Sequence, residues 1–502
     1  MHQAASALLN SLSLGKNITR VDTVSGSNPV GRIARVYEIA RNALEFRADH
    51  LVRRAAIERI LRRQVMFEKD PERLTAALLQ ELNWARYVGE TEVVAKTRKE
   101  IELVMAKFLL YGREAKVDRE WLLGLISAEI EEQLNPNSDY HKFTYFAFHV
   151  FKSRVKLTGV ENLDLVLWVA IDRVFSQADE PQVAYHLEKL MGSELTGTAL
   201  VEQASKLYLQ ATKSPVLNKI SVFVRKQMGP LVLLRDVYFV SPKDFSKLFE
   251  DKNLFESKTK EVLKDQLSLI KGRMNRATVR SLIYVFLTKM VLGILVEVPL
   301  EIFFRGGFSK LTLGINLLFP VVVMWLLTAN IKLPKKDDQD RIVARTTEMI
   351  WDFDKTPSEQ EILLRISKPS LPMSILFYVF YGLLFVTIFA GITLTLRAVG
   401  FGLVSWIIFN FFLCVVSFFT YRIRQSAQMY AYRPRVRERS TWGEMLMLPI
   451  VVVGGWVSVG VSRLNFLVFV FDFILEAPFK LILRFLDEWS QFLSLKRDEV
   501  VG

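Results

Sequence analysis

The chain has 502 residues, a net charge of +13 and a hydrophobic content of 51% that includes 36 Phe. Its mean hydropathy of +0.21 is high for a soluble chain of this length. A single cysteine, Cys414, excludes a disulfide scaffold, a cysteine-based zinc site and a CxxC redox motif. The sequence contains no HExxH, GxxxxGKS/T or GxSxG signature, so we expect neither enzymatic activity nor a cofactor.

Charged residues are distributed unevenly along the chain. Residues 1–280 hold 43 Lys and Arg and 35 Asp and Glu, whereas residues 281–502 hold 23 and 18, mostly between long apolar runs. This difference predicts a soluble half followed by a membrane half. We expect a flexible segment at 1–31, a helical domain at 32–272 and a transmembrane domain at 273–502. The first 15 residues lack the charged start and unbroken apolar core of a signal peptide.

The predicted soluble domain is all-helical. Its apolar residues recur at helical spacings, and no segment shows the alternation of a strand. Helix starts are indicated at Asp70-Pro71, Asp118, Asn162 and Ser241-Pro242, where capping residues or prolines precede apolar stripes. About ten helices without a fixed repeat favour an irregular bundle, with an α-solenoid-like array as the alternative. His141 and His149 lie eight residues apart, a spacing that favours structural roles over a metal site.

Long apolar stretches follow in the second half. Four of them, at 281–304, 311–331, 372–396 and 399–421, reach the roughly 20 residues that cross a hydrocarbon core. A fifth at 445–461 is short, and a sixth at 464–486 becomes amphipathic. We expect an all-α protein with six membrane spans. Four spans followed by an amphipathic tail is the alternative.

Basic residues in the connecting segments predict the orientation. The link at 332–370 carries eight Lys and Arg, and the link at 422–439 carries six, whereas the intervening link carries only Arg397. Because cytoplasmic loops are enriched in Lys and Arg, both heavily basic links are predicted to be cytoplasmic. With six spans, both termini of this multi-pass cell-membrane protein would also be cytoplasmic.

Two of the apolar stretches carry charges at intervals of four or eight residues, which places each set on one side of a helix. The first stripe also contains Pro299 and the last contains Pro478, both predicted to kink their helices. The first stripe consists of Lys289, Glu297, Glu301 and Arg305, and the last of Asp472, Glu476, Lys480 and Arg484.

These stripes have two interpretations. They either mark helix ends at the membrane surfaces, which is favoured, or form a polar path around Glu297, Asp472 and Glu476. An isolated charge in hydrocarbon costs at least ~2.5–3.5 kcal/mol, so each carboxylate there must be paired or protonated. We therefore expect the first and last membrane helices to pack with their stripes in contact.

A basic and aromatic segment follows the fourth apolar stretch. We expect its arginines to contact anionic lipid headgroups rather than nucleic acid, because the segment borders a membrane span. These arginines are Arg422, Arg424, Arg433, Arg435, Arg437 and Arg439.

The function class follows indirectly. A large helical domain offers grooves for a cytoplasmic protein partner, and no catalytic set of residues is evident. The sequence therefore favours a membrane-anchored binding or scaffolding component. A transporter or channel that uses the charged stripes is the alternative.

Overall fold

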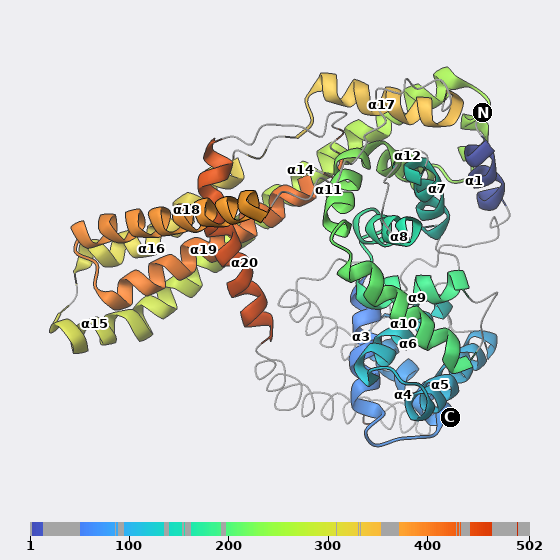
Figure 1. Ribbon diagram of the computed structural model, residues 1–502, viewed down its shortest axis with the longest axis horizontal. Helices are drawn as coiled ribbons and strands as arrows, with labels where there is room; N and C mark the ends of the chain where they lie inside the picture. Colours follow the sequence, from blue (N-terminus) through green and yellow to red (C-terminus); the bar gives the residue numbers. More distant parts are fainter. Residues whose placement is uncertain are drawn as a thin grey trace, which may run out of the picture. The chain divides into compact units, whose positions relative to one another are not determined.

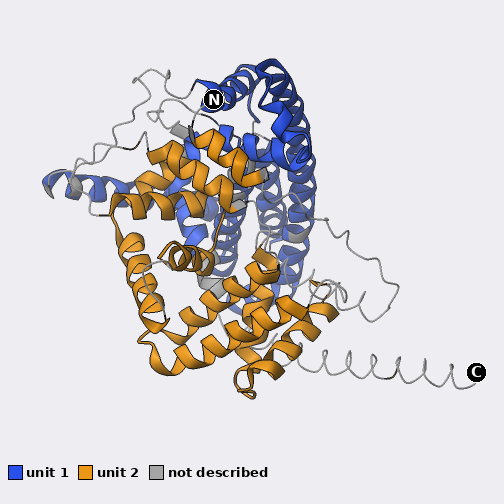
Figure 2. Cartoon of the chain, turned by 90° about the vertical axis from the view of Figure 1, so that its right-hand side faces the viewer, with its two compact units in different colours: residues 1–2, 225–464 blue, residues 3–224, 465–502 orange. Residues whose placement is uncertain are grey.

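A computed structural model describes residues 3–13, 51–352 and 371–463, together with residue 489. Short gaps within these ranges fall at 86, 89–94, 135–139, 153–154, 156–161, 192–196, 308, 330, 332, 428, 431 and 433–441. All regular secondary structure in the described residues is helical, so the predicted all-α class is confirmed. The chain divides into two compact units, unit 1 (residues 1–2 and 225–464) and unit 2 (residues 3–224 and 465–502), coloured separately in Figure 2.

Unit 2 contains a bundle of short helices whose apolar stripes form a shared core. In α4, for example, Leu74, Leu78 and Leu82 are completely buried. Its described helices are α1 (Gln3–Ser13), α3 (Val52–Gln64), α4 (Pro71–Trp84), α5 (Ala95–Glu114), α6 (Arg119–Leu134), α7 (Tyr140–Lys152), α8 (Leu163–Val174), α9 (Glu180–Met191) and α10 (Gly197–Lys213). The next helix, α11 (Leu217–Gln227), spans the division between the units.

Three of the predicted helix starts are confirmed. Asp70 accepts a hydrogen bond from the Glu72 amide at the start of α4, and Asp118 accepts one from the Trp121 amide (3.0 Å) at the start of α6. Helix α8 begins directly after Asn162. The Asp70 and Asp118 side chains satisfy amide groups that have no partner within the helix, whereas the Asn162 side chain makes no capping hydrogen bond.

The start predicted at Ser241-Pro242 is wrong. Pro242 lies in a turn before the one-turn helix α13 (Phe245–Leu248), and the long helix α14 begins at Lys252. The Asp251 carboxylate accepts hydrogen bonds from the amides of Asn253 (2.8 Å) and Leu254 (3.4 Å). Asp251 therefore supplies the cap for the long helix, which places its start ten residues later than expected.

Unit 1 is organised around one long helix. Its helices are α12 (Gly229–Val240), α13, α14 (Lys252–Leu292), a π-helical turn η2 (Gly293–Glu297), α15 (Val298–Arg305), α16 (Lys310–Ala329), α17 (Lys336–Trp351), α18 (Leu371–Ala398), α19 (Leu403–Ala427) and α20 (Trp442–Arg463). Helix α14 has 41 residues, which is about 60 Å. Its first half lies against α17, where the Phe255 and Trp351 rings are 5.1 Å apart, and its second half lies against α16 and α19 (Figure 1).

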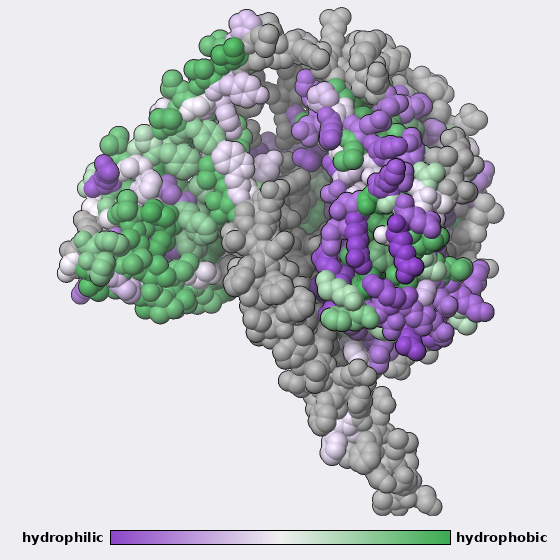
Figure 3. Space-filling view, turned by 60° about the horizontal axis from the view of Figure 1, so that its bottom comes forward, coloured by the Kyte–Doolittle hydropathy of each residue, from purple (hydrophilic) through white to green (hydrophobic). Residues whose placement is uncertain are grey.

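Four helices in the described residues are long and apolar enough to cross a membrane. They are Lys252–Phe304, Lys310–Ala329, Ile375–Ala398 and Leu403–Tyr421, and they cover the first four predicted spans. Large side chains such as Phe303, Trp325 and Tyr378 are exposed on them. Figure 3 shows hydrophobic residues gathered at the left, over these helices. The apolar part of α20, Leu446–Val457, is shorter, and the sixth predicted span lies outside the described residues.

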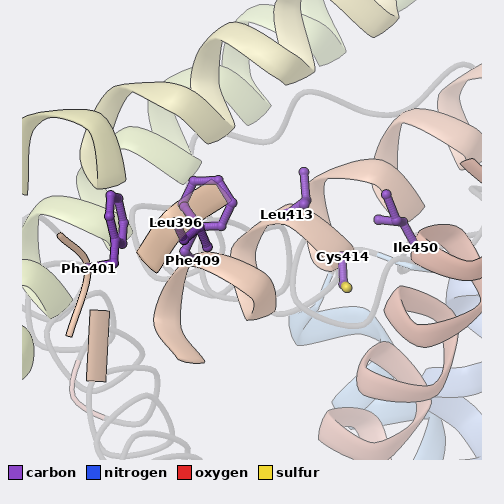
Figure 4. Packing of buried hydrophobic residues seen from close by; sticks show 6 residues of the cluster. All are labelled: Leu396, Phe401, Phe409, Leu413, Cys414 and Ile450. Carbon is purple, nitrogen blue, oxygen red and sulfur yellow. The ribbon is translucent and has the colours of Figure 1, made fainter. Parts of the chain in front are cut away.

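Helices α18, α19 and α20 meet in an apolar cluster that includes the only cysteine. Leu396, Phe409, Cys414 and Ile450 point into this cluster (Figure 4). A Cβ atom at Gly454 of α20 would lie 2.0 Å from the Cys414 carbonyl oxygen. The contact between α19 and α20 therefore requires glycine at this position, as is common where membrane helices pack closely.

Candidate functional site

Four buried polar side chains meet among the apolar helices of unit 1. We call Glu297 of η2, Glu301 of α15, Asn316 of α16 and Ser405 of α19 the polar cluster. Their exposed fractions are 2%, 4%, 0% and 3%. The surrounding helices are those long and apolar enough to span a membrane. Such residues in membrane helices are costly and commonly functional.

Hydrogen bonds connect all four members of the polar cluster. The Ser405 hydroxyl lies 2.6 Å from Glu297 Oε1 and 3.0 Å from Glu301 Oε1. The Asn316 amide donates to Glu297 Oε1 (2.5 Å) and to the Ser405 carbonyl (3.4 Å). The cluster thus ties three separate segments of chain together at one point.

The Glu301 carboxylate lies at the start of α19. Its Oε1 accepts a hydrogen bond from the Ser405 backbone amide (3.3 Å), within the first turn of that helix. A helix N-terminus carries a partial positive charge and unpaired amides, so it stabilises a nearby anion. Gly402, directly before α19, permits this approach, because a Cβ there would lie 2.1 Å from Glu301 Oε1.

Glu297 ends the π-helical turn that precedes Pro299. Within this turn the Val298 amide donates to the Gly293 carbonyl, five residues earlier. Pro299 has no amide hydrogen and clashes with the carbonyl four residues before it, so the helix cannot continue regularly through this point. A π-turn therefore lies directly before Pro299, a feature frequently found at functional sites, and the kink at Pro299 stays a prediction.

Lys289 is buried two turns before the polar cluster and is 1% exposed. Its ammonium lies 4.4 Å from the centroid of the Phe412 ring and 3.4 Å from the Ile408 carbonyl oxygen. Both contacts come from α19. A cation–π contact and a carbonyl acceptor thus stabilise this ammonium. No carboxylate among the described residues lies within ion-pair distance of it.

The buried face of α16 is unusually polar for an apolar helix. Its buried residues recur every four positions, and three of the five are polar: Thr312, Asn316, Pro320, Met324 and Thr328. The exposed faces carry residues such as Leu318, Val322 and Trp325. Thr312 lies one turn from Asn316, whereas Pro320 and Met324 separate Asn316 from Thr328, and Met324 packs in an apolar cluster with Val285, Phe412 and Val416.

The structure places part of the first predicted stripe in one site. Glu297 and Glu301 belong to the polar cluster and Lys289 lies near it, but their contacts are to α16 and α19. Only the backbone of Arg305 and Arg422 is described. The other stripe residues and most of the basic segment lie outside the described residues: Asp472, Glu476, Pro478, Lys480, Arg484, Arg433, Arg435, Arg437 and Arg439. The predicted packing of the two stripes therefore remains a prediction.

Asn316 and Ser405 were missed by sequence reasoning, which followed charges only. Asn316 is an amide in the middle of an apolar stretch, and an unpaired amide in hydrocarbon is also costly. That signal could have identified Asn316. Ser405 carries no comparable signal, since α19 also contains Ser417 and Thr420.

The basic and aromatic segment provides two buried anchors. Tyr430 and Tyr432 are 2% and 8% exposed, and the Tyr430 hydroxyl donates to the Asp236 carboxylate of α12. Burial raises the pKa of Asp236, and the adjacent Arg235 opposes that shift. Arg424 is half-buried at the end of α19. The two tyrosines therefore have structural contacts within unit 1.

Unit 2 contains a second buried polar network. His186 Nδ1 lies 2.7 Å from Asp172 Oδ2, and the His141 ring contacts His186 edge-on at 4.3 Å. Burial and the neighbouring His186 lower the pKa of His141 to about 4. His149 contacts the Tyr145 ring instead, so the two predicted structural histidines have separate environments. Within the described residues, no group of three His, Cys, Asp or Glu is arranged to hold a metal ion.

Comparison with known proteins gives no match to a family model, a curated protein or a solved structure.

Proposed function

We propose that this protein is a cation-coupled transporter or channel of the membrane, with the polar cluster as its coupling site. The observation that supports this proposal is the pair of buried carboxyl groups, Glu297 and Glu301, which share one hydroxyl at Ser405. An anchor needs no ionisable group among its membrane helices, and keeping one there is costly. Buried Thr312, one turn from Asn316 on α16, supports a polar approach to the site from that end of the helix. The proposal assigns no enzymatic reaction and no cofactor.

Ion flux in proteoliposomes tests this proposal. The full chain is reconstituted, and entry of H⁺, Na⁺ and K⁺ is followed with ion-sensitive dyes under an imposed gradient. Glu297→Gln should reduce the coupled flux at least tenfold, because glutamine cannot exchange a cation. Ser417→Ala is the matched control, since Ser417 is also a buried serine of α19, and its flux should stay within twofold of the parent. Equal flux for the parent chain and protein-free vesicles would contradict the proposal.

We further propose six spans with both termini in the cytoplasm. Elements near the predicted cytoplasmic links meet in unit 1: the Thr346 hydroxyl of α17 donates to the Pro230 carbonyl of α12 (3.2 Å), and Tyr430 also contacts α12. These contacts are consistent with an even number of spans between the links. In a Cys414→Ala background, cysteines introduced at 340 and 436 should resist impermeant thiol reagents in intact cells. Labelling of either position from outside would contradict this orientation. The arginines at 422–439 would then face anionic headgroups.

A binding or scaffolding role is the second candidate function. Phe67, which follows α3, is 83% exposed beside a pocket of about 350 Å³ lined by Arg63, Arg73 and Leu74. An exposed aromatic residue beside charged groups is typical of a protein-binding surface. Capture of a cytoplasmic partner by the full chain should be lost with Phe67→Ser and retained with Met66→Ser, a matched exposed neighbour. Equal capture by both variants would contradict a role for this surface.

A further inference from the structure

The Ser405 hydroxyl lies close to more carboxylate oxygens than it can donate hydrogen bonds to. It carries one hydrogen, yet it lies within hydrogen-bond distance of both Glu297 Oε1 and Glu301 Oε1. If both carboxyl groups were ionised, one of these contacts would bring two unshared electron pairs together. The geometry is satisfied when one of the two carboxyl groups is protonated and donates to the serine oxygen.

The two carboxyl groups have different surroundings. Glu301 faces the N-terminal end of α19 and accepts a hydrogen bond from the Ser405 amide. Glu297 is 2% exposed, and no described Lys, Arg or His lies within ion-pair distance of it. Its Oε2 has no hydrogen-bond partner among the described residues, although a buried ionised oxygen requires one. One proton placed on Glu297 gives each Ser405 contact a donor and an acceptor and leaves Oε2 as an uncharged oxygen.

We propose that Glu297 carries a proton at neutral pH and that Glu297, Ser405 and Glu301 form a proton relay. This inference identifies the proton as the cation of the proposed transport function, and its role in the protein rests on that function. The experiment below tests the protonation of Glu297 without measuring transport. The Glu297 hydroxyl donates to Ser405 Oγ at 2.6 Å, and the Ser405 hydroxyl donates to ionised Glu301 at 3.0 Å.

The relay is balanced without a further reactant. The O–H bond of Glu297 breaks as a new O–H bond forms on Ser405, whose own hydrogen passes to Glu301. The result is ionised Glu297, protonated Glu301 and an unchanged serine. Asn316 donates to Glu297 Oε1 at 2.5 Å and stabilises the ionised product.

The charged groups around the relay are few. On the same helical run, Lys289 lies two turns before Glu297, and Arg305 follows Glu301 by one turn. On the packed elements, the Lys and Arg residues described are Lys310 at the start of α16, the exposed Arg397 of α18, and Arg422 and Arg424 at the far end of α19. The other ionisable residues there are Cys414 and Tyr421 of α19 and Tyr378 and Tyr381 of α18.

Infrared spectroscopy of the full chain in lipid nanodiscs at pH 7.5 tests this inference. A protonated carboxyl group has a C=O stretching band distinct from that of a carboxylate. A Glu188→Gln background is used, because burial and the nearby Glu129 carboxylate raise the pKa of Glu188 to about 7. The difference spectrum of Glu297→Gln against this parent should show the loss of one protonated carboxyl group. Glu301→Gln should retain that band.

Ser405→Ala and Ser417→Ala separate the relay from general effects on α19. Ser405→Ala should shift the band, because the protonated Glu297 loses its acceptor, whereas Ser417→Ala should leave it unchanged. If Glu297→Gln does not fold, the parent band and its shift in Ser405→Ala still test the inference. The absence of the band at pH 7.5, its persistence in Glu297→Gln, or its loss when sodium chloride replaces choline chloride would overturn the inference. The last result would indicate a sodium site.

The ion-flux experiment and the infrared experiment can fail independently of each other. A protonated Glu297 with no ion flux would leave the relay in place and contradict transport. A coupled flux without the protonated band would support transport and overturn the relay.

Discussion

Unit 2 and the apolar helices of unit 1 differ in the groups that contact their buried charges. In unit 2, the Arg54 guanidinium is 1% exposed and forms ion pairs with Glu58 (2.6 Å) and Asp179 (2.7 Å). Among the apolar helices of unit 1, the contacts of Glu297 and Glu301 include a hydroxyl, an amide side chain and the end of a helix. Lys289 contacts an aromatic ring and a carbonyl.

This contrast has a physical cause. A helix surrounded by water can carry acidic and basic residues on its outer faces, and their long side chains reach the buried group. In a helix surrounded by lipid, every additional charge has a free-energy cost, so neutral dipoles are the less costly partners. We expect substitutions at buried charges of unit 2 to destabilise the fold by breaking ion pairs. Substitutions among the apolar helices of unit 1 are expected to destabilise it by altering close packing and hydrogen bonding.

The largest effect is expected from Arg54→Ala. Removal of this guanidinium leaves Asp179 and Ser127 without their buried partner, which should cost about 3–5 kcal/mol. Hydrogen–deuterium exchange of α3 and α6 in the full chain should accelerate accordingly. Arg62→Ala is the control, because Arg62 is 47% exposed and its ion pairs are worth about 1 kcal/mol or less. Similar exchange in the two variants would show that burial does not distinguish these arginines.

Gly454→Ala should have the next largest effect. Its new methyl group would meet the Cys414 backbone oxygen at 2.0 Å, and backbone cannot shift as readily as a side chain. We expect α20 to separate from α19, with a loss of about 3 kcal/mol. Since Cys414 is the only cysteine and is 2% exposed, its alkylation rate reports the change and should rise at least tenfold.

Gly455→Ala provides the matched control for that experiment. Its methyl group would meet the Phe418 ring at 3.5 Å, which is an ordinary contact. Its alkylation rate should remain within twofold of the parent. Equal rates for the two alanine variants would contradict the close contact of α19 and α20.

Glu188→Gln should alter the pH dependence of unit 2. The folded state holds the Glu188 proton up to a pKa of about 7, whereas the unfolded state releases it near 4.5. Stability from this group is therefore complete below pH 4.5 and is lost as the pH rises to about 7. Glutamine removes this loss, so the variant should be about 2 kcal/mol more stable than the parent at pH 8 and nearly equal at pH 4.5. Thermal unfolding at the two pH values checks this, and an equal gain at both would exclude titration of Glu188.

Tyr430→Phe should have the smallest effect. It removes only the hydroxyl that donates to the buried Asp236 carboxylate of α12. A hydrogen bond to a charged partner is worth about 1.5–3 kcal/mol, but protonation of Asp236 can reduce the loss, so we expect about 1 kcal/mol. Thermal unfolding of the full chain measures it, with Tyr421→Phe as an exposed control. A larger loss from the control would contradict the anchoring role of Tyr430.

Local sequence patterns predicted the helices well, because the signals that start and bury a helix are close together in the chain. Asp70 and Asp118 cap helices within three residues of themselves. The apolar stretches are also local signals, and four of them are helices of membrane-spanning length in the described residues. At Ser241-Pro242 the local signal was wrong, since Asp251 provided the stronger cap nearby.

The composition and spacing of residues by themselves determined the helical class, the apolar helices and the unusual charges at Lys289, Glu297 and Glu301. Only the tertiary structure decided which groups surround those charges. Ser405 lies 108 residues after Glu297, and Asn316 lies on a different helix from both. The periodicity of one helix identifies its buried face but carries no information about the side chain opposite, because that depends on which helices pack together and at what register. The partners of the buried carboxyl groups, and with them the proposed chemistry of the site, follow from the packing of α14 to α19.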